Sequence, residues 1–247
     1  MSKPAPQTLQ VIYKEQISLH MIRLKLYGKH INENIQWQPG CYVKLVIPNA
    51  LSSDEKPKLR TYTAKSYNPN EKVFTIDFAI HQPAGPATDW AINASVGDEI
   101  DLLGPGELKI NSAEGDWYVF AADMSALPAA ISVMESLSAD AKGYALLEIM
   151  DEGDKQNISI PKNIEVQWFI HPNPTIKSNQ QLDALKIIKH LEGVPNIFVA
   201  GELSTIREIK SYLQGEERFN NAITYISSYW KIGLKEEEHK HAKMENP

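Results

Sequence analysis

The segment Leu59–Lys65, LRTYTAK, places an arginine, two threonines, a tyrosine and a lysine in a stretch of strand-like sequence. Side chains alternate between the two faces of a strand, so Arg60 and Tyr62 share one face and Lys65 belongs to the other. In an antiparallel sheet with one face in water, the inner face would be apolar and the outer face polar. The face of Arg60 and Tyr62 is neither, and it suits a flat, partly apolar and negatively charged ligand.

The sequence around this segment, from Thr8 to about Gly106, consists of short strands separated by turn signals rich in proline and glycine. The expected strands are TLQVIYKEQ, HMIRLKLYG, CYVKLVIP, LRTYTAKSY, KVFTIDFAIH and DEIDLLG. Six strands at this spacing predict a six-stranded antiparallel β-barrel. One segment interrupts them, because GPATDWAINA at 85–94 is expected to form a short helix with Pro86 in its first turn.

From Trp117 onward, apolar strand-like segments alternate with helical ones. The expected strands are WYVFAA, YALLEIMD, IEVQWFIH and NIFVAGE, and the expected helices are ALPAAISVMESL, QLDALKIIKHL and STIREIKSYL. This alternation predicts a doubly wound parallel sheet with helices on its faces. Thr205 and Glu208, three residues apart, indicate a capping box at the start of the last helix.

The predicted organisation is therefore a β domain over residues 1–111 and an α/β domain over residues 112–235. The remaining residues, 236–247, carry mixed charge without an apolar period, so we expect a disordered, solvated tail. A barrel followed by a doubly wound sheet is an architecture used to bind a flavin and a nicotinamide nucleotide together.

Composition narrows the class of protein. The chain has 247 residues, 43% of them hydrophobic, which is enough for one large domain or two ordinary ones. Its net charge of −6 argues against a general binder of nucleic acids or membrane surfaces. The N-terminal MSKPAPQTLQ lacks an apolar secretion-signal segment, so we expect a cytoplasmic protein. The single cysteine, Cys41, excludes an internal disulfide and a four-cysteine metal site, so redox chemistry needs an organic cofactor or a partner.

Two features suit a pyrophosphate. Arg60 would supply a positive charge from the barrel strand. The helix at 85–94 would direct its positive end and its free N–H groups to the same phosphates, and Gly85 would let the backbone approach closely. His81 precedes this helix and suits a hydrogen bond to a phosphate or a ribose. Tyr62 and the neighbouring threonines would line an isoalloxazine ring.

Several pieces of sequence, in order, resemble the siderophore-interacting proteins. They are R-T-Y-T, I-D-F-A-I-H, G-P-A-T-x-W-A and G-D-E-I-x-L-L-G-P in the first half, then AADMSALPAA, AGELSTIREIKSYL and SSYWKIG in the second. The resemblance extends from about residue 10 to about residue 235. It implies an FAD-binding barrel and a nicotinamide-type domain of the ferredoxin-reductase-like superfamily. It also implies one-electron reduction of siderophore-bound Fe(III) in the cytoplasm.

The resemblance implies which residues contact the FAD. They are Arg60, Thr61, Tyr62, Thr63, Asp77, Phe78, His81, Gly85, Pro86, Ala87, Thr88, Trp90, Ser125 and Trp230. A ferric tris-catecholate is trianionic, so a rim of cations would attract it. The candidates for this rim are Lys44, Lys65, Arg207 and Lys231. Each set also has a plainer interpretation, in which the aromatic residues pack in the core and the cations are ordinary surface charges.

The sequence departs from the family pattern where the electron donor would bind. Met124 stands in place of the glutamate of the family's D-E-T, and Lys210 in place of its second arginine. AADMSALP is not a G-x-G-x-x-G fingerprint. NADH, NADPH and a ferredoxin therefore all remain open as the donor, and Arg207 is the candidate to meet a 2′-phosphate.

Other functions on the same scaffold also remain open. One is a general flavin or ferredoxin-type reductase with another acceptor, and another is a non-enzymatic flavoprotein that carries ferric siderophores. No arrangement of paired carboxylates, nucleophile and base, or metal ligands is evident, and flavin electron transfer needs none, because the cofactor carries the chemistry. The ligand would be a ferric catecholate or hydroxamate, and we expect a monomer.

Overall fold

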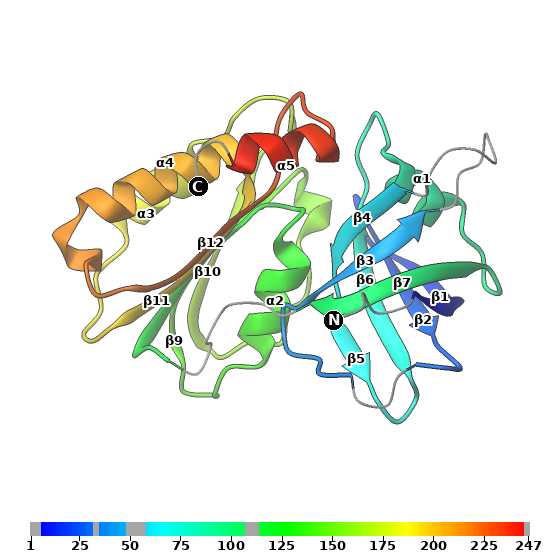
Figure 1. The fold of residues 1–247 in the computed structure, drawn as a ribbon. Helices are drawn as coiled ribbons and strands as arrows, with labels where there is room; N and C mark the ends of the chain where they lie inside the picture. Colours follow the sequence, from blue (N-terminus) through cyan, green and yellow to red (C-terminus); the bar gives the residue numbers. More distant parts are fainter. Residues whose placement is uncertain (1–5, 32–34, 48–57, 107–113, 245–247) are drawn as a thin grey trace. The chain divides into compact units, whose positions relative to one another are not determined.

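The structure, a computed structural model, describes residues 6–31, 35–47, 58–106 and 114–244 of the chain. The chain divides into two compact units, Met1–Leu108 and Lys109–Pro247 (Figure 1). The first unit is built on an antiparallel sheet, and the second on a parallel sheet with helices. Both predicted fold classes are confirmed.

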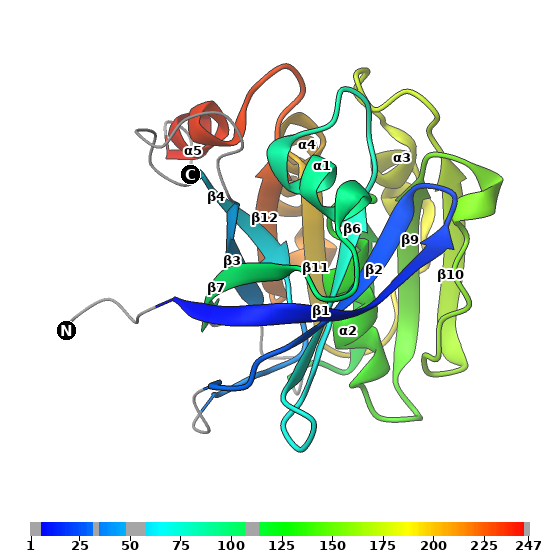
Figure 2. The same cartoon turned by 90° about the vertical axis from the view of Figure 1, so that its right-hand side faces the viewer.

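The sheet of the first unit has seven strands in the order β4-β3-β7-β1-β2-β6-β5 (Figure 2). They are β1 (Gln7–Ser18), β2 (Met21–Tyr27), β3 (Tyr42–Ile47), β4 (Lys58–Thr63), β5 (Ser66–Asn68), β6 (Val73–Ala79) and β7 (Glu99–Gly106). Alternate residues point inward, as Leu24 and Leu26 do in β2. Together with Ala87 and Ala91 of α1 (Pro86–Asn93), the inward side chains of the strands form one hydrophobic core.

The prediction of six strands was short by one, because LRTYTAKSY is two strands. β4 pairs with β3, whereas β5 pairs with β6. Between them, the backbone of Ala64 bonds outside the ladder: its N–H donates to the Cys41 carbonyl and its carbonyl accepts from the Trp37 indole. Ala64 is fully buried, so the chain turns inward where it changes partner.

The sheet of the second unit has five parallel strands in the order β10-β9-β8-β11-β12. They are β8 (Trp117–Ala122), β9 (Lys142–Ile149), β10 (Asn163–Ile170), β11 (Pro195–Glu202) and β12 (Ile223–Trp230). The helices are α2 (Leu127–Glu135), α3 (Gln180–Ile187), α4 (Leu203–Gly215) and α5 (Glu236–Met244), with short 3₁₀ turns at Glu152–Asp154 and Glu217–Phe219. The predicted strands include the first four of these five, and β12 was missed.

Helices cover both faces of the parallel sheet, as predicted. α3 and α4 lie on one face and α2 on the other (Figure 1). Leu185 of α3 and Ile209 of α4 share a core with Val119 and Val199 of the sheet. Within the described part of the chain, no helix combines the length and the apolar character that a membrane-spanning segment needs.

The predicted capping box of α4 was wrong. The helix begins at Leu203, and the carboxylate of Glu202 accepts from the N–H groups of Ser204 (2.6 Å) and Thr205 (3.0 Å). Thr205 instead donates its hydroxyl to the Ser178 carbonyl at 3.2 Å. The helix therefore starts earlier than the box requires, because an acidic N-cap at the end of β11 satisfies its first free N–H groups.

The expectation of a disordered tail was also wrong, because residues 236–244 form α5. His239 of this helix is only 5% exposed, and its Nε2 lies 3.0 Å from the Ser228 hydroxyl on β12. Arg207 of α4 donates to the Ala242 carbonyl at 3.0 Å. These polar contacts hold a helix whose sequence has no apolar period.

Candidate functional site

The pairing of β3 and β4 shows which way the opening segment faces. Arg60 lies opposite Leu45, and Tyr62 lies opposite Val43. Leu45 and Val43 are fully buried, and directly paired residues of an antiparallel sheet point to the same side. Arg60 and Tyr62 therefore lie on the core face of the sheet, and both stay half-buried. The shared face that the sequence predicted is confirmed.

Three of the expected aromatic contacts are brought together. The ring of Tyr62 lies 4.5 Å from that of Phe78 on β6, and Phe78 lies 6.1 Å from Trp90 on α1. Phe78 is fully buried, whereas Tyr62 and Trp90 are half-buried. Phe78 therefore supports two partly exposed rings from inside the core, and its own side chain is not available at a surface.

The N-terminus of α1 is open. Its N-cap, Gly85, is extended (φ −84°, ψ 166°), and no side chain of the described residues caps the helix. A Cβ at Gly85 would meet none of the described residues within 4 Å. The first N–H groups of α1 and the open space before them fit a phosphate. Pro86, at the first helical position, is half-buried.

The other expected contacts on α1 turn inward. Ala87 is 3% and Thr88 is 2% exposed. The Thr88 hydroxyl lies 3.5 Å from the Ala79 carbonyl and 3.4 Å from Nε2 of His81. His81 itself is exposed. Thr88 is therefore placed to orient the His81 ring rather than to present its own side chain at a surface.

Asp77 has an internal partner that the sequence did not reveal. Its two carboxylate oxygens accept from Nε and Nη2 of Arg23, each at 2.7 Å. The two residues are direct partners in the pairing of β2 with β6. Because Asp77 is 3% exposed, its expected contact with a cofactor would require this ion pair to be shared or broken.

Two of the cations expected at the substrate rim, Lys44 and Lys65, belong to the first unit. Lys44 is paired with Thr61 and so belongs to the opposite face of the sheet from Arg60 and Tyr62. Thr61 is exposed, and Thr63, which shares its face, is 7% exposed. Lys65 is half-buried in the link between β4 and β5. The structure therefore does not bring Lys44 to the face of Tyr62.

In the second unit, carboxylates gather where the strand order reverses. Ligands of doubly wound folds bind outside the carboxyl ends of the strands at this point, which here lies between β8 and β11. Asp123 directly follows β8, Glu148 lies near the end of β9, and Glu202 ends β11. Asp123 is 9% and Glu202 is 6% exposed.

Ser125 and Trp230, both expected at the FAD, meet at Asp123. Oδ1 of Asp123 accepts from the N–H (2.9 Å) and the hydroxyl (2.6 Å) of Ser125 and from the N–H of Ala126 (3.3 Å). Oδ2 accepts from the indole Nε1 of Trp230 at 2.8 Å. Trp230 is half-buried. A buried carboxylate thus joins the loop before α2 to the end of β12.

Burial is the largest influence on two of these carboxyl groups. It raises the pKa of Asp123, against the hydrogen bonds from Ser125, Trp230 and Ala126, which lower it. It also raises the pKa of Glu148, where a hydrogen bond from Ser178 acts in the opposite direction and the charge of Asp123 adds to the rise. Among the described residues, Oε2 of Glu148 has no hydrogen-bond partner. The edge is therefore rich in carboxyl groups shifted toward their neutral forms.

The expected cations of the second unit have different environments. Arg207 is engaged with α5 through Ala242, and its Nε is buried without a hydrogen-bond partner in the described part of the chain. It is therefore not placed as an open surface cation. Lys231 directly follows Trp230 and is half-buried.

Sequence reasoning missed four charged residues that pair with these side chains or lie at the same edge of the sheet: Arg23, Asp123, Glu148 and Glu202. For the carboxylates a signal was present, since each lies at the end of a predicted parallel strand, and such ends share one edge. For Arg23 there was none, because its partner is 54 residues away.

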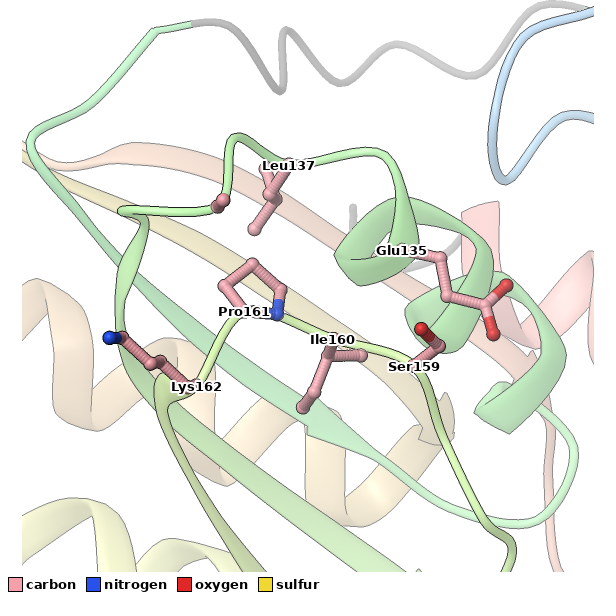
Figure 3. Close-up of a pocket in the computed structure, with 7 residues that line it drawn as sticks. Glu135, Leu137, Ser159, Ile160, Pro161 and Lys162 are labelled. Carbon is pink, nitrogen blue, oxygen red and sulfur yellow. The ribbon is translucent and has the colours of Figure 1, made fainter.

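A surface hollow of about 340 Å³ in the second unit is lined by none of these residues. Figure 3 shows its lining by Glu135, Leu137, Ser159, Ile160, Pro161 and Lys162. None of the expected cofactor or substrate contacts lines it. It is not the candidate site.

Comparison with known sequences places both units in one family. Residues 49–108 match the model of the siderophore-interacting FAD-binding domain, and residues 115–233 match that of the siderophore-interacting protein. The ferric vibriobactin reductase ViuB of Vibrio cholerae is 29% identical over 262 aligned positions, covering 97% of this chain and 96% of its own length.

Solved structures of similar proteins share the fold. The siderophore-interacting protein SipS of Aeromonas hydrophila gives a TM-score of 0.84 at 23% identity, covering 97% of each chain. A siderophore utilization protein of T. fusca gives a TM-score of 0.84 at 26% identity, covering 95% of this chain and 96% of its own. The two family models together span most of the sequence, and this chain belongs to the siderophore-interacting protein family.

Proposed function

We propose that this chain binds FAD in its first unit and reduces siderophore-bound Fe(III) in the cytoplasm, so that iron is released as Fe(II). The observation that carries the proposal is the presence of Arg60, Tyr62 and the open N-terminus of α1 in the unit that matches the FAD-binding domain. The Vibrio cholerae relative is named as a ferric vibriobactin reductase, which supports the same reaction class.

The residues of the first unit fit an FAD. Arg60 would pair with its pyrophosphate, and the first N–H groups of α1 would donate to the same group. Tyr62 would contact the flavin ring, and Phe78 would hold the rings of Tyr62 and Trp90 in place. Bound FAD supplies the chemistry, because it accepts an electron pair from a donor and releases electrons singly.

Reduction of Fe(III) to Fe(II) weakens the binding of the iron by the siderophore. Catecholate and hydroxamate oxygens are hard ligands that hold Fe(III) strongly and Fe(II) weakly. The protein therefore needs to attract the ferric complex and bring it to the flavin, and it needs no side-chain ligands for the metal. Lys65 and Lys231 are the proposed contacts for an anionic complex.

The donor that we favour is NADH or a reduced ferredoxin, with NADPH as the weaker candidate. Arg207, the residue expected to meet a 2′-phosphate, is engaged with α5. Met124 is 7% exposed, and the edge around it carries buried carboxyl groups rather than a glycine-rich phosphate loop. Stopped-flow rates of flavin reduction at equal donor concentrations would decide, and a large preference for NADPH would refute this order.

The first test is the identity of the cofactor. The purified protein should be yellow, and mass analysis of the released flavin should give FAD. Arg60→Ala should weaken FAD binding by roughly 1.5–3 kcal/mol, the value of a charge-assisted hydrogen bond. Lys58→Ala is the matched control, because Lys58 is an exposed cation on the same strand. Release of FMN, or a protein that never binds flavin, would overturn the proposal.

Turnover separates the reductase from its alternatives. A ferric siderophore incubated with donor and an Fe(II) trap such as ferrozine should yield trapped Fe(II) catalytically. A flavoprotein that reduces other acceptors but not the ferric complex would be a general reductase. One that binds the complex without turnover would be a carrier. We expect the active form to be a monomer, which sedimentation or light scattering would check.

A further inference from the structure

The carboxylate of Asp123, in the second unit, accepts hydrogen bonds at both of its oxygens. One oxygen accepts from two backbone N–H groups and a hydroxyl in the loop before α2. The other accepts from the indole of Trp230, 107 residues further along the chain. Because the carboxylate is planar and its first oxygen is fixed by three donors, its second oxygen points in one direction. The indole N–H must follow that direction.

Gly201 provides the space for this carboxylate. Its φ of +147° lies where side chains are rarely found. A Cβ added there would lie 2.5 Å from Oδ2 of Asp123, the oxygen that holds Trp230. Oδ2 cannot move away without breaking the bonds on Oδ1. The glycine at the end of β11 is therefore required by the carboxylate of the neighbouring strand.

A second carboxylate fixes the backbone just beyond the indole. Oε1 of Glu202 accepts from the N–H of Ile232 at 3.3 Å, while its other oxygen caps α4. The pairing of β11 with β12 shifts here, so that Glu202 lies opposite Trp230. Trp230 is thus held at its side chain by Asp123 and beside its backbone by Glu202.

We propose that Asp123 is a positioning residue that fixes the plane of the Trp230 indole, with Gly201 giving it room and Glu202 holding the adjoining backbone. Trp230 is half-buried, so a polar edge is anchored while part of the ring stays accessible. This proposal deepens the proposed function and rests on the expected contact of the Trp230 ring with the FAD. It assigns the orientation of that ring to a carboxylate that never touches the flavin itself.

The direct test is the indole N–H of Trp230 in protein labelled with ¹⁵N at tryptophan. Its resonance is assigned by its loss in Trp230→Phe. In the unaltered protein it should exchange with solvent slowly. In Asp123→Asn it should exchange roughly tenfold faster, because the hydrogen bond from the indole to Oδ2 is lost. The resonances of the four other tryptophans should not move.

Two further variants test this result, one expected to reproduce the faster exchange and one expected not to. Gly201→Ala keeps every polar group but crowds Oδ2, so it should also speed exchange at Trp230. Glu148→Gln replaces the neighbouring buried carboxyl and keeps the carboxylate of Asp123, so it should leave exchange at Trp230 unchanged. Fast exchange in the unaltered protein, or unchanged exchange in Asp123→Asn, overturns the inference. The first of these outcomes is measured on the unaltered protein, so it does not depend on whether a variant folds.

A functional readout separates positioning from general stabilisation. Trp230→Phe should alter flavin binding or the KM for the ferric complex. If Asp123 acts through Trp230, the same change should add almost nothing in an Asp123→Asn background. Additive effects would overturn the positioning role. If the indole is protected but Trp230→Phe leaves flavin and substrate unaffected, the proposed role of Trp230 at the FAD fails while its anchoring by Asp123 stands.

Discussion

At the scale of single residues, the ion pair of Arg23 and Asp77 is the clearest electrostatic contribution to the first unit. The Asp77 side chain is 1% exposed and that of Arg23 is 25% exposed. A buried carboxylate is tolerated because a bidentate guanidinium satisfies both of its oxygens. Removing Arg23 takes both of these hydrogen bonds away from the buried Asp77 carboxylate.

We therefore expect Arg23→Ala to lower the free energy of unfolding by about 2–3 kcal/mol, less than for a fully buried pair because the arginine is partly solvated. Urea denaturation would measure it. Lys25→Ala is the matched control: Lys25 is an exposed cation two residues along the same strand, over the Tyr13 ring. Its loss should be at most about 1 kcal/mol. Similar losses for both variants would mean that the ion pair contributes no more than an ordinary surface charge.

We expect Tyr229 to make the stability of the protein sensitive to high pH. Burial, more than the neighbouring Tyr225 and the charge of Asp123, raises the pKa of its phenol well above the usual value. Above about pH 10 the unfolded chain loses this proton while the folded chain keeps it. The folded state then binds more protons than the unfolded state, so stability falls as pH rises.

The expected slope is up to about 1.4 kcal/mol per pH unit for this one proton. Tyr229→Phe should remove that share of the slope between about pH 10 and 11 and leave stability near pH 7 little changed. Denaturation curves at several pH values would show it. An unchanged slope would mean that the phenol ionises in the folded protein much as it does in the unfolded chain.

A residue-level feature could be predicted when its cause is local in the sequence, and could not be predicted when its cause is a distant part of the chain. The shared face of Arg60 and Tyr62 could be predicted because the two-residue period of a strand is local. Asp123 and Trp230, or Arg23 and Asp77, are joined only by the fold, at separations of 107 and 54 residues. The sequence predicted a flavin-type site, but not which side chains hold its rings and charges in place.

At the scale of elements, α5 shows how polar contacts can order a segment without an apolar stripe. Its anchoring contacts include His239, against the Ser228 hydroxyl, and the Ala242 carbonyl, which accepts from Arg207. The sequence around it has the mixed charge that is usual in disordered tails. The partners that order it lie on β12 and α4, so its own sequence could not reveal them.

The two histidines of α5 offer a matched test. His239 is 5% exposed and bonded to Ser228, whereas His241, two residues on, is exposed. His239→Ala should increase hydrogen exchange of the α5 amides. It should also lower the free energy of unfolding by about 0.5–1.5 kcal/mol, the value of one net hydrogen bond. His241→Ala should do neither. Equal exchange in both variants would show that the His239 contact does not hold the helix.

Elements with a strong local pattern were predicted, and elements defined by their partners were not. The buried strands β8, β9 and β11 and the helices between them could be read from continuous apolar runs alternating with helical periods. β5 is three residues long and is separated from β4 only by a change of partner strand. β12 has mostly half-buried residues and therefore no clear apolar run.

At the scale of the whole molecule, the net charge repels an anionic ferric complex, whereas cations at the proposed site would attract it. The chain carries −6, which repels an anionic ferric complex at long range. Under the proposed function, capture of such a complex would therefore depend on cations near the flavin. Lys65 and Lys231 are both half-buried beside proposed flavin contacts, whereas Lys44 lies on the opposite face of its sheet from Arg60.

We expect Lys65→Ala and Lys231→Ala each to raise the KM for a trianionic ferric catecholate while the FAD content stays the same. Lys44→Ala should have the smallest effect of the three. The increase should shrink as salt rises from low ionic strength to 0.1 M and beyond, because exposed charges are screened over about 10 Å at 0.1 M. A neutral ferric hydroxamate should be much less affected, since its capture gains little from a positive field.

Lys189→Ala is the control for a lysine elsewhere on the surface, because Lys189 is exposed in the loop between α3 and β11. It removes the same unit of charge from the whole molecule, so it corrects for the change in net charge alone. If it raises the KM as much as Lys65→Ala, the response comes from the overall field and not from a local contact. If charged and neutral complexes lose equally, or salt has no influence, the lysines do not capture the substrate by charge. Only a loss confined to the anionic complex, reduced by salt and absent from Lys189→Ala, fits a local cationic rim on an acidic protein.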